Sequence, residues 1–571
     1  MTLTVMNGLL FFEACSLFIS LWPLLILPNK LSFATGLQPV CHTFNSRFIY
    51  WLLKKQEFAG VYMWYIVIAG DSLFRIAQRF GTTAGILQQA NKLSGTGLSI
   101  GQALYIPPVP GRVFQYTVQP GDSLYSLARL FSTTMPALVE LNNIQDSLIY
   151  AGQRIRIPFY TEVIVNVAQA NIRSGTGTNF SSIAIMVRGA RLPVMGYRNG
   201  WYQVGLYNGA TGWISENIVA LDAHDSSRPV QPIIGFYTLA EGPGLPSSYA
   251  SFTENVRSLS SVSLFFYQIS RNDPTQIDKF FQFTDQDIQV LVAIAHRNNI
   301  KVLPIVHNLL YRPGGVELAK NLVRQLVSSP RYRRAFARNL VALIQRYNFD
   351  GVNIDIEDAY TEDSDNLAQL YVDIADEFRS GGYYLSASVP SRVSDEPFNP
   401  FSDPFNYEVI GSAVDEFIVM LYNEYGWPGS PPGPPVSIPW FRRVVTYTKT
   451  KMPWYKIAAA VSVFGFDFNL TTGRSSYASY DRAIALSRQY GSTIQFDMRQ
   501  QTPWFPYTDA QGQQHQVWFE DEDSIRVKIR TAWDMGINGI ALWRLGMEDP
   551  NIWTMIENEV VVKKIIENFR R

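Results

Sequence analysis

The stretch FDGVNIDIE, residues 349–357, decides the fold of the largest part of this chain. Its alternating residues predict a buried β-strand, because successive side chains of a strand point to opposite faces. The apolar residues would face a layer of helices: Val352, Ile354 and Ile356. The polar residues would point together the other way: Asn353, Asp355 and Glu357. Burying two carboxylates and an amide is costly, so this row indicates a catalytic site rather than a solvated salt-bridge network.

Strands alternate with helices from Ile233 onward, which is typical of a parallel sheet or barrel. A helix precedes the key strand, since Ser329-Pro330 opens an apolar stripe formed by Phe336, Leu340 and Ile344. Eight candidate strands fit a (β/α)8 TIM barrel over residues 232–560: Ile233–Tyr237, Ser263–Tyr267, Lys301–Val306, Gly351–Glu357, Tyr383–Val389, Glu416–Tyr422, Lys456–Phe464 and Gly539–Trp543. A doubly wound sheet would alternate in the same way, but no Gly-rich phosphate loop follows the first strand.

The key strand also resembles a family signature. Asp350, Asn353, Asp355 and Glu357 occupy the positions of D-x-x-D-x-D-x-E in glycoside hydrolase family 18, with Asn353 where most chitinases carry Asp. The resemblance implies that Glu357 is the general acid/base and that Asp355 orients the N-acetyl group of the substrate. The acetamido oxygen would be the nucleophile, so no second enzyme carboxylate attacks the sugar. No metal or organic cofactor is implied.

Other strand ends are similar to the same family, and barrel sites lie at these carboxyl ends. The first strand ends in Tyr237, the sixth in Met420, Tyr422 and Asn423, and the eighth in Trp543. The resemblance implies that Tyr422 hydrogen-bonds the acetamido group and that Trp543 forms the floor under the sugar. We expect the substrate-binding residues to be Asn353, Asp350, Tyr237, Met420, Asn423 and Trp543. Ordinary core packing is the alternative interpretation for Met420 and Trp543.

The implied mechanism sets an electrostatic requirement. Glu357 must hold a proton near neutral pH, and burial together with the charge of Asp355 would raise its pKa. Asn353 cannot ionise, although it can hydrogen-bond Asp355. We therefore expect Asp355 to ionise more readily than in a chitinase, which would change the pH optimum and leave retaining hydrolysis intact.

Two internal repeats precede the barrel. Residues 64–108 and 114–158 each predict strand, helix, helix and strand, and the sequence from Tyr65 reappears from Tyr116. They resemble LysM modules, which implies binding to glycans that contain N-acetylglucosamine, either peptidoglycan or chitin. Residues 162–222 are rich in strands and resemble a bacterial SH3-like barrel; a spacer that positions its neighbours is the alternative.

The first 62 residues differ from the rest. Residues 9–28 are about long enough to span a bilayer and carry one charge, Glu13. Either this stretch is a membrane anchor, or residues 1–62 are an upstream extension and Met63 is the natural start.

Cys15 and Cys41 are the two cysteines, so residues 42–571 hold no disulfide framework or cysteine metal site. Lys+Arg and Asp+Glu both number 48, and this balance does not indicate a nucleic acid partner.

Several departures from the family 18 pattern bear on the choice of substrate. The third strand continues into His307-Asn308 without the S-x-G-G of many chitinases, residues 422–440 are rich in Pro and Gly, and residues 477–519 predict an insertion. With Asn353 and the LysM pair, these features resemble the spore-cortex and germination branch of family 18, N-acetylglucosaminidases of the spore or cell wall. The remaining alternatives are a chitooligosaccharide hydrolase and a lectin-like wall-binding protein without activity.

Overall fold

A computed structural model provides the structure of the 571-residue chain. It describes residues 114–564 except 132, 226–227, 240–244, 281–282, 398, 423 and 428, and, between 63 and 106, residues 63–67, 72, 73, 76, 87, 88, 91, 93, 95–100 and 102–106. The predicted hydrophobic extension 1–62 therefore lies outside the described residues. Within the described residues, no helix has the length and apolar character needed to cross a membrane.

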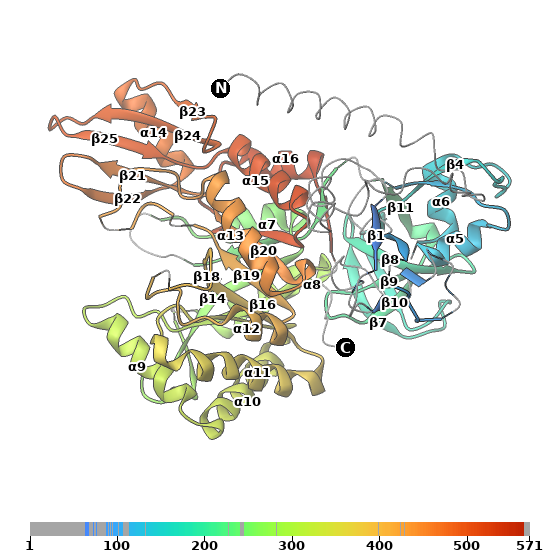
Figure 1. The fold of residues 1–571 in the computed structure, drawn as a ribbon, viewed down its shortest axis with the longest axis horizontal. Coiled ribbons are helices and arrows are strands. Elements are labelled where there is room, and N and C mark those ends of the chain that lie inside the picture. The colour runs from blue at the N-terminus through green and yellow to red at the C-terminus, as the bar shows by residue number, and fades with distance from the viewer. Residues whose placement is uncertain are drawn as a thin grey trace, which may run out of the picture. The chain divides into compact units, whose positions relative to one another are not determined.

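Eight parallel strands close into a barrel, as the alternating pattern predicts (Figure 1). They are β13 (Ile233–Tyr237), β14 (Ser261–Ile269), β16 (Lys301–His307), β17 (Gly351–Asp355), β18 (Tyr384–Pro390), β19 (Glu416–Met420), β20 (Ile457–Ser462) and β26 (Gly539–Trp543). The barrel closes because β13 pairs with both β14 and β26, which rules out the doubly wound alternative. β17 ends two residues earlier than predicted, so Glu357 lies in the loop that follows the strand.

Helices cover the outside of the barrel. They are α7 (Tyr249–Asn255), α8 (Asp285–Arg297), α9 (Gly315–Val327), α10 (Pro330–Tyr347), α11 (Ser364–Gly381), α12 (Tyr407–Ala413), α13 (Ile438–Lys451), α15 (Glu522–Asp534) and α16 (Asn551–Glu559). α10 begins as predicted, because the Ser329 side chain accepts a hydrogen bond from the Tyr332 N–H and Pro330 occupies the first turn. Short 3₁₀ turns and strands complete the domain: η4 (Val256–Ser258), η5 (Thr361–Asp363), η6 (Trp454–Lys456), β15 (Ile277–Lys279), β12 (Val230–Gln231) and β27 (Val561–Val562).

The apolar side chains of the barrel strands pack into two separate cores. One parity packs against the helices, where Val352, Ile354 and Ile356 of the key segment are fully buried as predicted. The other parity fills the barrel lumen with a smaller apolar cluster: Ile234, Phe236, Phe265, Ile305, Ile418, Ala458, Ala460 and Ala541. A side chain two residues from one of these along the same regular strand therefore also points into the lumen.

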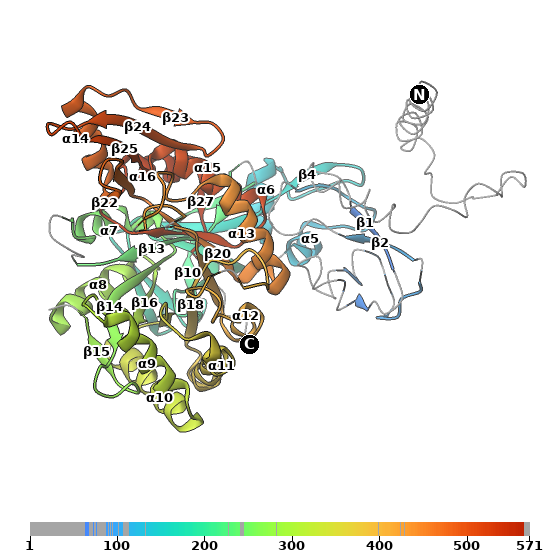
Figure 2. The same cartoon turned by 60° about the vertical axis from the view of Figure 1, so that its left-hand side comes forward.

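A small sheet stands out from the barrel as a separate layer (Figures 1 and 2). It contains β21 (Gly465–Asn469), β22 (Arg474–Ala478), β23 (Gln495–Asp497), β24 (Thr502–Thr508), β25 (Gln514–Trp518) and the helix α14 (Tyr480–Tyr490). The insertion begins earlier than the predicted residue 477, because β21 pairs with both β22 and β25.

The segments before the barrel also fold as predicted. The second repeat contains β3 (Phe114–Thr117), α5 (Leu124–Leu130), α6 (Met135–Asn142) and β4 (Arg154–Ile157), and in the first repeat β1 (Met63–Ile66) pairs with β2 (Ala103–Ile106). The SH3-like unit is a seven-stranded sheet: β5 (Tyr160–Val165), β6 (Gln169–Arg173), β7 (Ser182–Val187), β8 (Arg191–Arg198), β9 (Trp201–Gly205), β10 (Thr211–Ser215) and β11 (Val219–His224), with η3 (Glu216–Ile218) before β11.

Candidate active site

The carboxyl end of β17 carries two of the predicted site residues into the lumen. Asn353 pairs in register with Ile305 of the lumen cluster, and Asp355, two residues later, pairs with His307. Both side chains are buried. The sequence therefore predicted the face of this strand correctly, because the strand has a regular period of two.

The amide of Asn353 is held by the neighbouring strand β18. Its Nδ2 donates to Ser386 Oγ at 2.9 Å, and its Oδ1 accepts from Ser388 Oγ at 3.0 Å. Ser386 Oγ in turn donates to the buried Glu416 carboxylate at 3.0 Å. Burial raises the pKa of Glu416 to about 7, against the lowering effects of Ser386 and Lys301. Asn353 therefore links the site to a buried acid deeper in the barrel.

Glu357 is half-buried in the loop after β17, and Asn308 holds its backbone there. The Glu357 N–H donates to Asn308 Oδ1 at 3.0 Å, while Asn308 Nδ2 donates to the Asp358 carbonyl at 2.7 Å. Asn308 itself is buried and follows β16. One amide side chain thus fixes two consecutive peptide groups at the predicted general acid. The sequence showed Asn308 at a strand end but gave no signal of this contact.

Aromatic rings form one wall of the lumen at the same end. Trp543 closes β26 and is half-buried, with its ring centroid 6.0 Å from that of Tyr422 at an interplanar angle of 22°. Phe236 and Phe265 meet the Trp543 ring edge-on at 5.3 Å and 5.4 Å. Met420 is the last residue of β19, and its buried side chain is on the lumen face of that strand. The structure therefore brings Trp543, Tyr422 and Met420 to the end of the barrel where Asp355 lies.

Two of the expected substrate-binding residues lie elsewhere. Asp350 precedes β17 at the opposite end from Asp355, about 16 Å away at 3.3 Å per residue. Its Oδ2 accepts a hydrogen bond from the Val302 N–H at 2.7 Å and lies 3.1 Å from His296 Nε2. Asp350 therefore connects the start of β17 to β16 and α8.

Tyr237 points away from the lumen and packs on Phe252 and Phe266 in the core beneath the helices. Its role in substrate binding was therefore predicted wrongly, because Phe236 has the lumen parity of β13. The alternation along the strand separates Phe236 from Tyr237, and it would have identified Phe236 if the sequence had shown which of the two faces meets the lumen. The remaining predicted residue, Asn423, lies outside the described residues.

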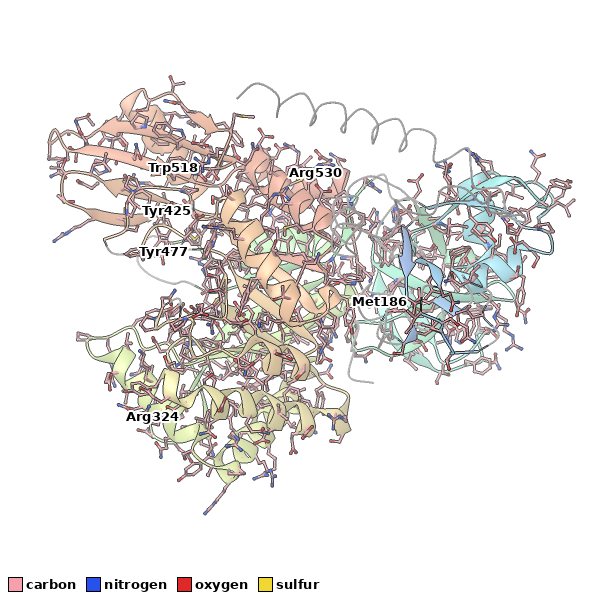
Figure 3. The ribbon with its side chains drawn as sticks, viewed as in Figure 1. Met186, Arg324, Tyr425, Tyr477, Trp518 and Arg530 are labelled. Carbon is pink, nitrogen blue, oxygen red and sulfur yellow. The ribbon has the colours of Figure 1, made fainter. Side chains whose placement is uncertain are left out.

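Exposed aromatic side chains continue outward from this end of the barrel. Trp427 and Tyr477 are 52% and 54% exposed. Their segments touch, since Ser475 Oγ on β22 donates to the Gly426 carbonyl at 2.8 Å. Figure 3 shows the labelled Tyr425 and Tyr477 near one another at the insertion. We call Trp427 and Tyr477 the aromatic rim.

One cluster in the SH3-like unit has the residue types of a metal site. Ligand atoms of Glu162, Asp222 and His224 lie within 4.8 Å of one another. The Arg191 guanidinium contacts both carboxylates, however, and already supplies the compensating positive charge. This cluster is therefore an ion-pair network and does not indicate a cation site.

Comparisons with known proteins agree with this geometry. The sequence matches "Glycosyl hydrolases family 18" over residues 249–548, "LysM domain" over residues 65–107 and 116–158, and "Bacterial SH3 domain" over residues 168–219. The family 18 match covers more than half of the chain.

Two curated relatives extend the comparison. "Putative sporulation-specific glycosylase YdhD" of Bacillus subtilis is 26% identical over 500 residues, which cover 86% of this chain and 97% of that protein. "Cortical fragment-lytic enzyme" of Bacillus subtilis is 30% identical over 279 residues, which cover 48% of this chain and 64% of that enzyme.

A solved structure shares the fold. The Bacillus cereus spore cortex-lytic enzyme SleL superposes with a TM-score of 0.53 at 22% identity, and the match covers 88% of this chain and 99% of that chain. This match shows that the two proteins share a fold.

Proposed function

Since this chain belongs to glycosyl hydrolase family 18, we propose that it cleaves the N-acetylglucosamine β-1,4 linkages of peptidoglycan with retention of configuration. That the chain is a glycoside hydrolase with LysM domains, related to spore cortex-lytic enzymes, follows from the comparisons. Its natural substrate, in this proposal, is the cortex peptidoglycan of spores, and the LysM modules hold the enzyme on that glycan.

The observation that carries the proposal is the position of Glu357. The Asn308 side chain holds the backbone of Glu357 and Asp358 through two hydrogen bonds, which we call the Asn308 clamp, and Glu357 lies just beyond β17, two residues after the buried Asp355. Tyr422 and Trp543 supply an aromatic wall at the same end of the barrel. An acid, a second carboxylate and a flat apolar surface are the groups needed to protonate a leaving oxygen, orient an amide and support a sugar ring.

In the first step Glu357 gives its proton to the glycosidic oxygen as the C1–O bond breaks. The acetamido oxygen of the same sugar attacks C1, and the resulting oxazolinium ring carries the positive charge. Asp355 accepts a hydrogen bond from the acetamido N–H, which makes the amide oxygen more nucleophilic. Tyr422 hydrogen-bonds the acetamido group as it folds back.

In the second step a water molecule attacks C1 from the side that the leaving group vacated. Glu357, now a carboxylate, takes the proton of that water, and the oxazolinium ring opens to restore the acetamido group. Two inversions at C1 give net retention. The enzyme contributes no covalent nucleophile, so Glu357 and Asp355 are sufficient carboxylates for the chemistry.

The assignment to cortex is supported by the relatives and the modules. The curated relatives are named for sporulation and for cortical fragments, and two LysM domains precede the barrel. LysM modules are expected to bind N-acetylglucosamine-containing glycans, which peptidoglycan supplies along its whole length.

The test is product analysis by mass spectrometry. The full chain and its Glu357→Gln variant are incubated with spore cortex and with vegetative peptidoglycan, and the new reducing ends are reduced with borohydride. We expect reduced N-acetylglucosamine ends from the wild type alone, with cortex cleaved faster. Proton NMR of the first product should show the β-anomer.

Other outcomes would contradict specific parts of the proposal. Reduced muramic acid ends would mean that the other linkage of peptidoglycan is cut. Cleavage of N-acetylglucosamine oligomers without cleavage of either peptidoglycan would indicate a chitooligosaccharide hydrolase. An initial α-anomer would rule out retention.

A further inference from the structure

We propose that the Nε2–H group of His307 donates a hydrogen bond to the Asp355 carboxylate when a glycan occupies the site, which makes His307 a positioning residue. This inference rests on the proposed function, because it concerns the carboxylate that orients the acetamido group. It adds a residue that lies outside the D-x-x-D-x-D-x-E segment.

His307 stands between two polar residues in a row across three strands. The register of the parallel sheet pairs Gln268 of β14 with His307 of β16, and His307 with Asp355 of β17. The side chains of all three residues are on the lumen face of their strands. In β14 this holds because a bulge between Leu264 and Tyr267 shifts the alternation of the two faces by one residue. Neighbouring strands lie about 4.8 Å apart, so Asp355 is an immediate neighbour of the imidazole.

The ring of His307 is fixed in orientation. Phe265 stacks on one face with centroids 4.2 Å apart at 9°, and Phe280 meets the ring edge-on at 4.5 Å. The Leu309 N–H donates to Nδ1 at 3.1 Å. Because Nδ1 accepts this bond, the proton of a neutral imidazole is on Nε2.

The Nε2–H donor is buried and lacks a partner. The His307 side chain has no exposed surface, and no described residue lies within hydrogen-bonding distance of Nε2. Burial lowers the pKa of His307 to about 3, so the ring remains a neutral donor at working pH. A buried donor without an acceptor costs about 1–3 kcal/mol, which favours any rearrangement that supplies one.

Glycan binding supplies the reason for such a rearrangement. A sugar above Asp355 removes water from the carboxylate, and a desolvated carboxylate requires additional donors. The titratable groups around Asp355 include Glu357 on the same segment, His307 on β16, Tyr422 after β19 and Tyr371 on α11, whose pKa is raised by burial and by the charge of Asp355. The His307 Nε2–H and the Tyr371 hydroxyl are both buried neutral donors without a partner among the described residues. Tyr371 belongs to the core beneath the helices, whereas His307 shares the lumen with Asp355 and pairs with it in register, so His307 is the donor that the desolvated carboxylate can gain.

Nuclear magnetic resonance of the histidines tests the contact directly. The chain holds five histidines, so ¹⁵N-histidine labelling gives a simple spectrum in which His307 is identified by its loss in His307→Gln. The Glu357→Gln protein prevents turnover of the probe, an N-acetylglucosamine tetramer. We expect the tetramer to shift the Nε2–H proton downfield, and Asp355→Ala, which removes the acceptor, to abolish that shift.

Gln268 provides the matched control, because its Oε1 is the other buried acceptor in the row and also lacks a partner. Gln268→Leu should leave the tetramer-induced shift unchanged. The inference is overturned if the shift survives Asp355→Ala, or if Gln268→Leu abolishes it instead.

Kinetics supply a second readout. His307→Phe keeps the stacked ring but removes the donor, and we expect kcat to fall about 10- to 100-fold with KM within threefold. His307→Gln retains a donor of similar reach and should recover most of that loss. The acidic limb of the pH–rate profile should move to higher pH in His307→Phe, because a lost donor disfavours the ionised carboxylate.

The two proposals fail in different ways. If wild type and Glu357→Gln are equally inactive on every glycan, the proposed function fails, while the resonance of His307 still reports on Asp355. If the wild type is active and His307→Phe matches it in rate and pH profile, the inference fails alone.

Discussion

Asn308 and Glu357 are 49 residues apart in sequence, yet the Asn308 side chain accepts the Glu357 backbone N–H at 3.0 Å. The same side chain donates to the Asp358 carbonyl at 2.7 Å. The acid therefore lies on a loop whose path is set by the neighbouring strand. Its carboxyl is positioned by a hydrogen-bonded backbone rather than by the ladder of β17.

Removing this clamp should lower activity more than it lowers stability. Asn308→Ala removes the acceptor of the Glu357 N–H, which is only half-buried, so we expect a loss of about 1 kcal/mol of unfolding free energy. A displacement of Glu357 by about 1 Å can lower the rate about 100-fold. Hydrolysis rates and urea unfolding measure the two effects. Asn298→Ala, which removes a hydrogen bond from the side-chain Nδ2 to the Ile294 carbonyl at the end of α8, should lose stability only.

The aromatic wall should separate binding from chemistry. Tyr422→Phe keeps the ring beside Trp543 and removes the hydroxyl, so kcat should fall about 10- to 100-fold with little change in KM. Trp543→Ala removes the flat surface and should raise KM as well. Steady-state kinetics on short oligosaccharides distinguish the two variants. Trp201→Ala in the SH3-like unit is the control, and an equal loss there would indicate general destabilisation.

Restoring the acid that most chitinases carry should change the pH dependence. Asn353→Asp places a second carboxylate two residues before Asp355, and like charges oppose ionisation. The acidic limb of the pH–rate profile should therefore shift to higher pH by about one unit. Asn339→Asp adds the same charge where Asn339 contacts the Thr275 carbonyl and should leave the limb in place. An unchanged limb in Asn353→Asp would show that the two positions are not coupled.

Glu416 should make the fold less stable as pH rises. Its folded pKa of about 7 exceeds the ordinary value of 4.5, so between these values the folded state holds the proton more tightly than the unfolded state. This contribution is fully present below pH 4.5 and is lost as pH rises through 7, with an upper limit of roughly 3 kcal/mol. Denaturant unfolding from pH 4 to 8 should show a smaller decline in Glu416→Gln. The same decline in both proteins would contradict the assignment.

The aromatic rim should matter for long glycans alone. Trp427 and Tyr477 are about half exposed and belong to segments joined by the Ser475–Gly426 hydrogen bond. Exposed aromatic patches beside an active site commonly bind ligands. Trp427→Ala should slow cleavage of cortex strands several-fold and leave N-acetylglucosamine trimers unaffected. If the wild type and Trp427→Ala cleave cortex at equal rates, the glycan leaves the barrel by another route.

Much of the site could be predicted because it depends on local periodicity. The alternation in residues 349–357 placed Val352, Ile354 and Ile356 against the helices and Asn353 and Asp355 in the lumen. The ends of β13 and β26 were predicted to the residue. Tyr237 was assigned wrongly, since a strand has two faces and the isolated segment does not show which one meets the lumen.

By itself the sequence determined the order of the domains, the barrel, and the carboxylates at the end of its fourth strand, because hydrophobic period and turn residues act over short distances. Contacts between distant segments were decided by the tertiary structure. Asn308 meets Glu357, Ser386 and Ser388 hold Asn353, and His307 stands beside Asp355 because barrel closure sets the register between strands. No local pattern encodes that register, since it depends on how all eight strands pack around one lumen.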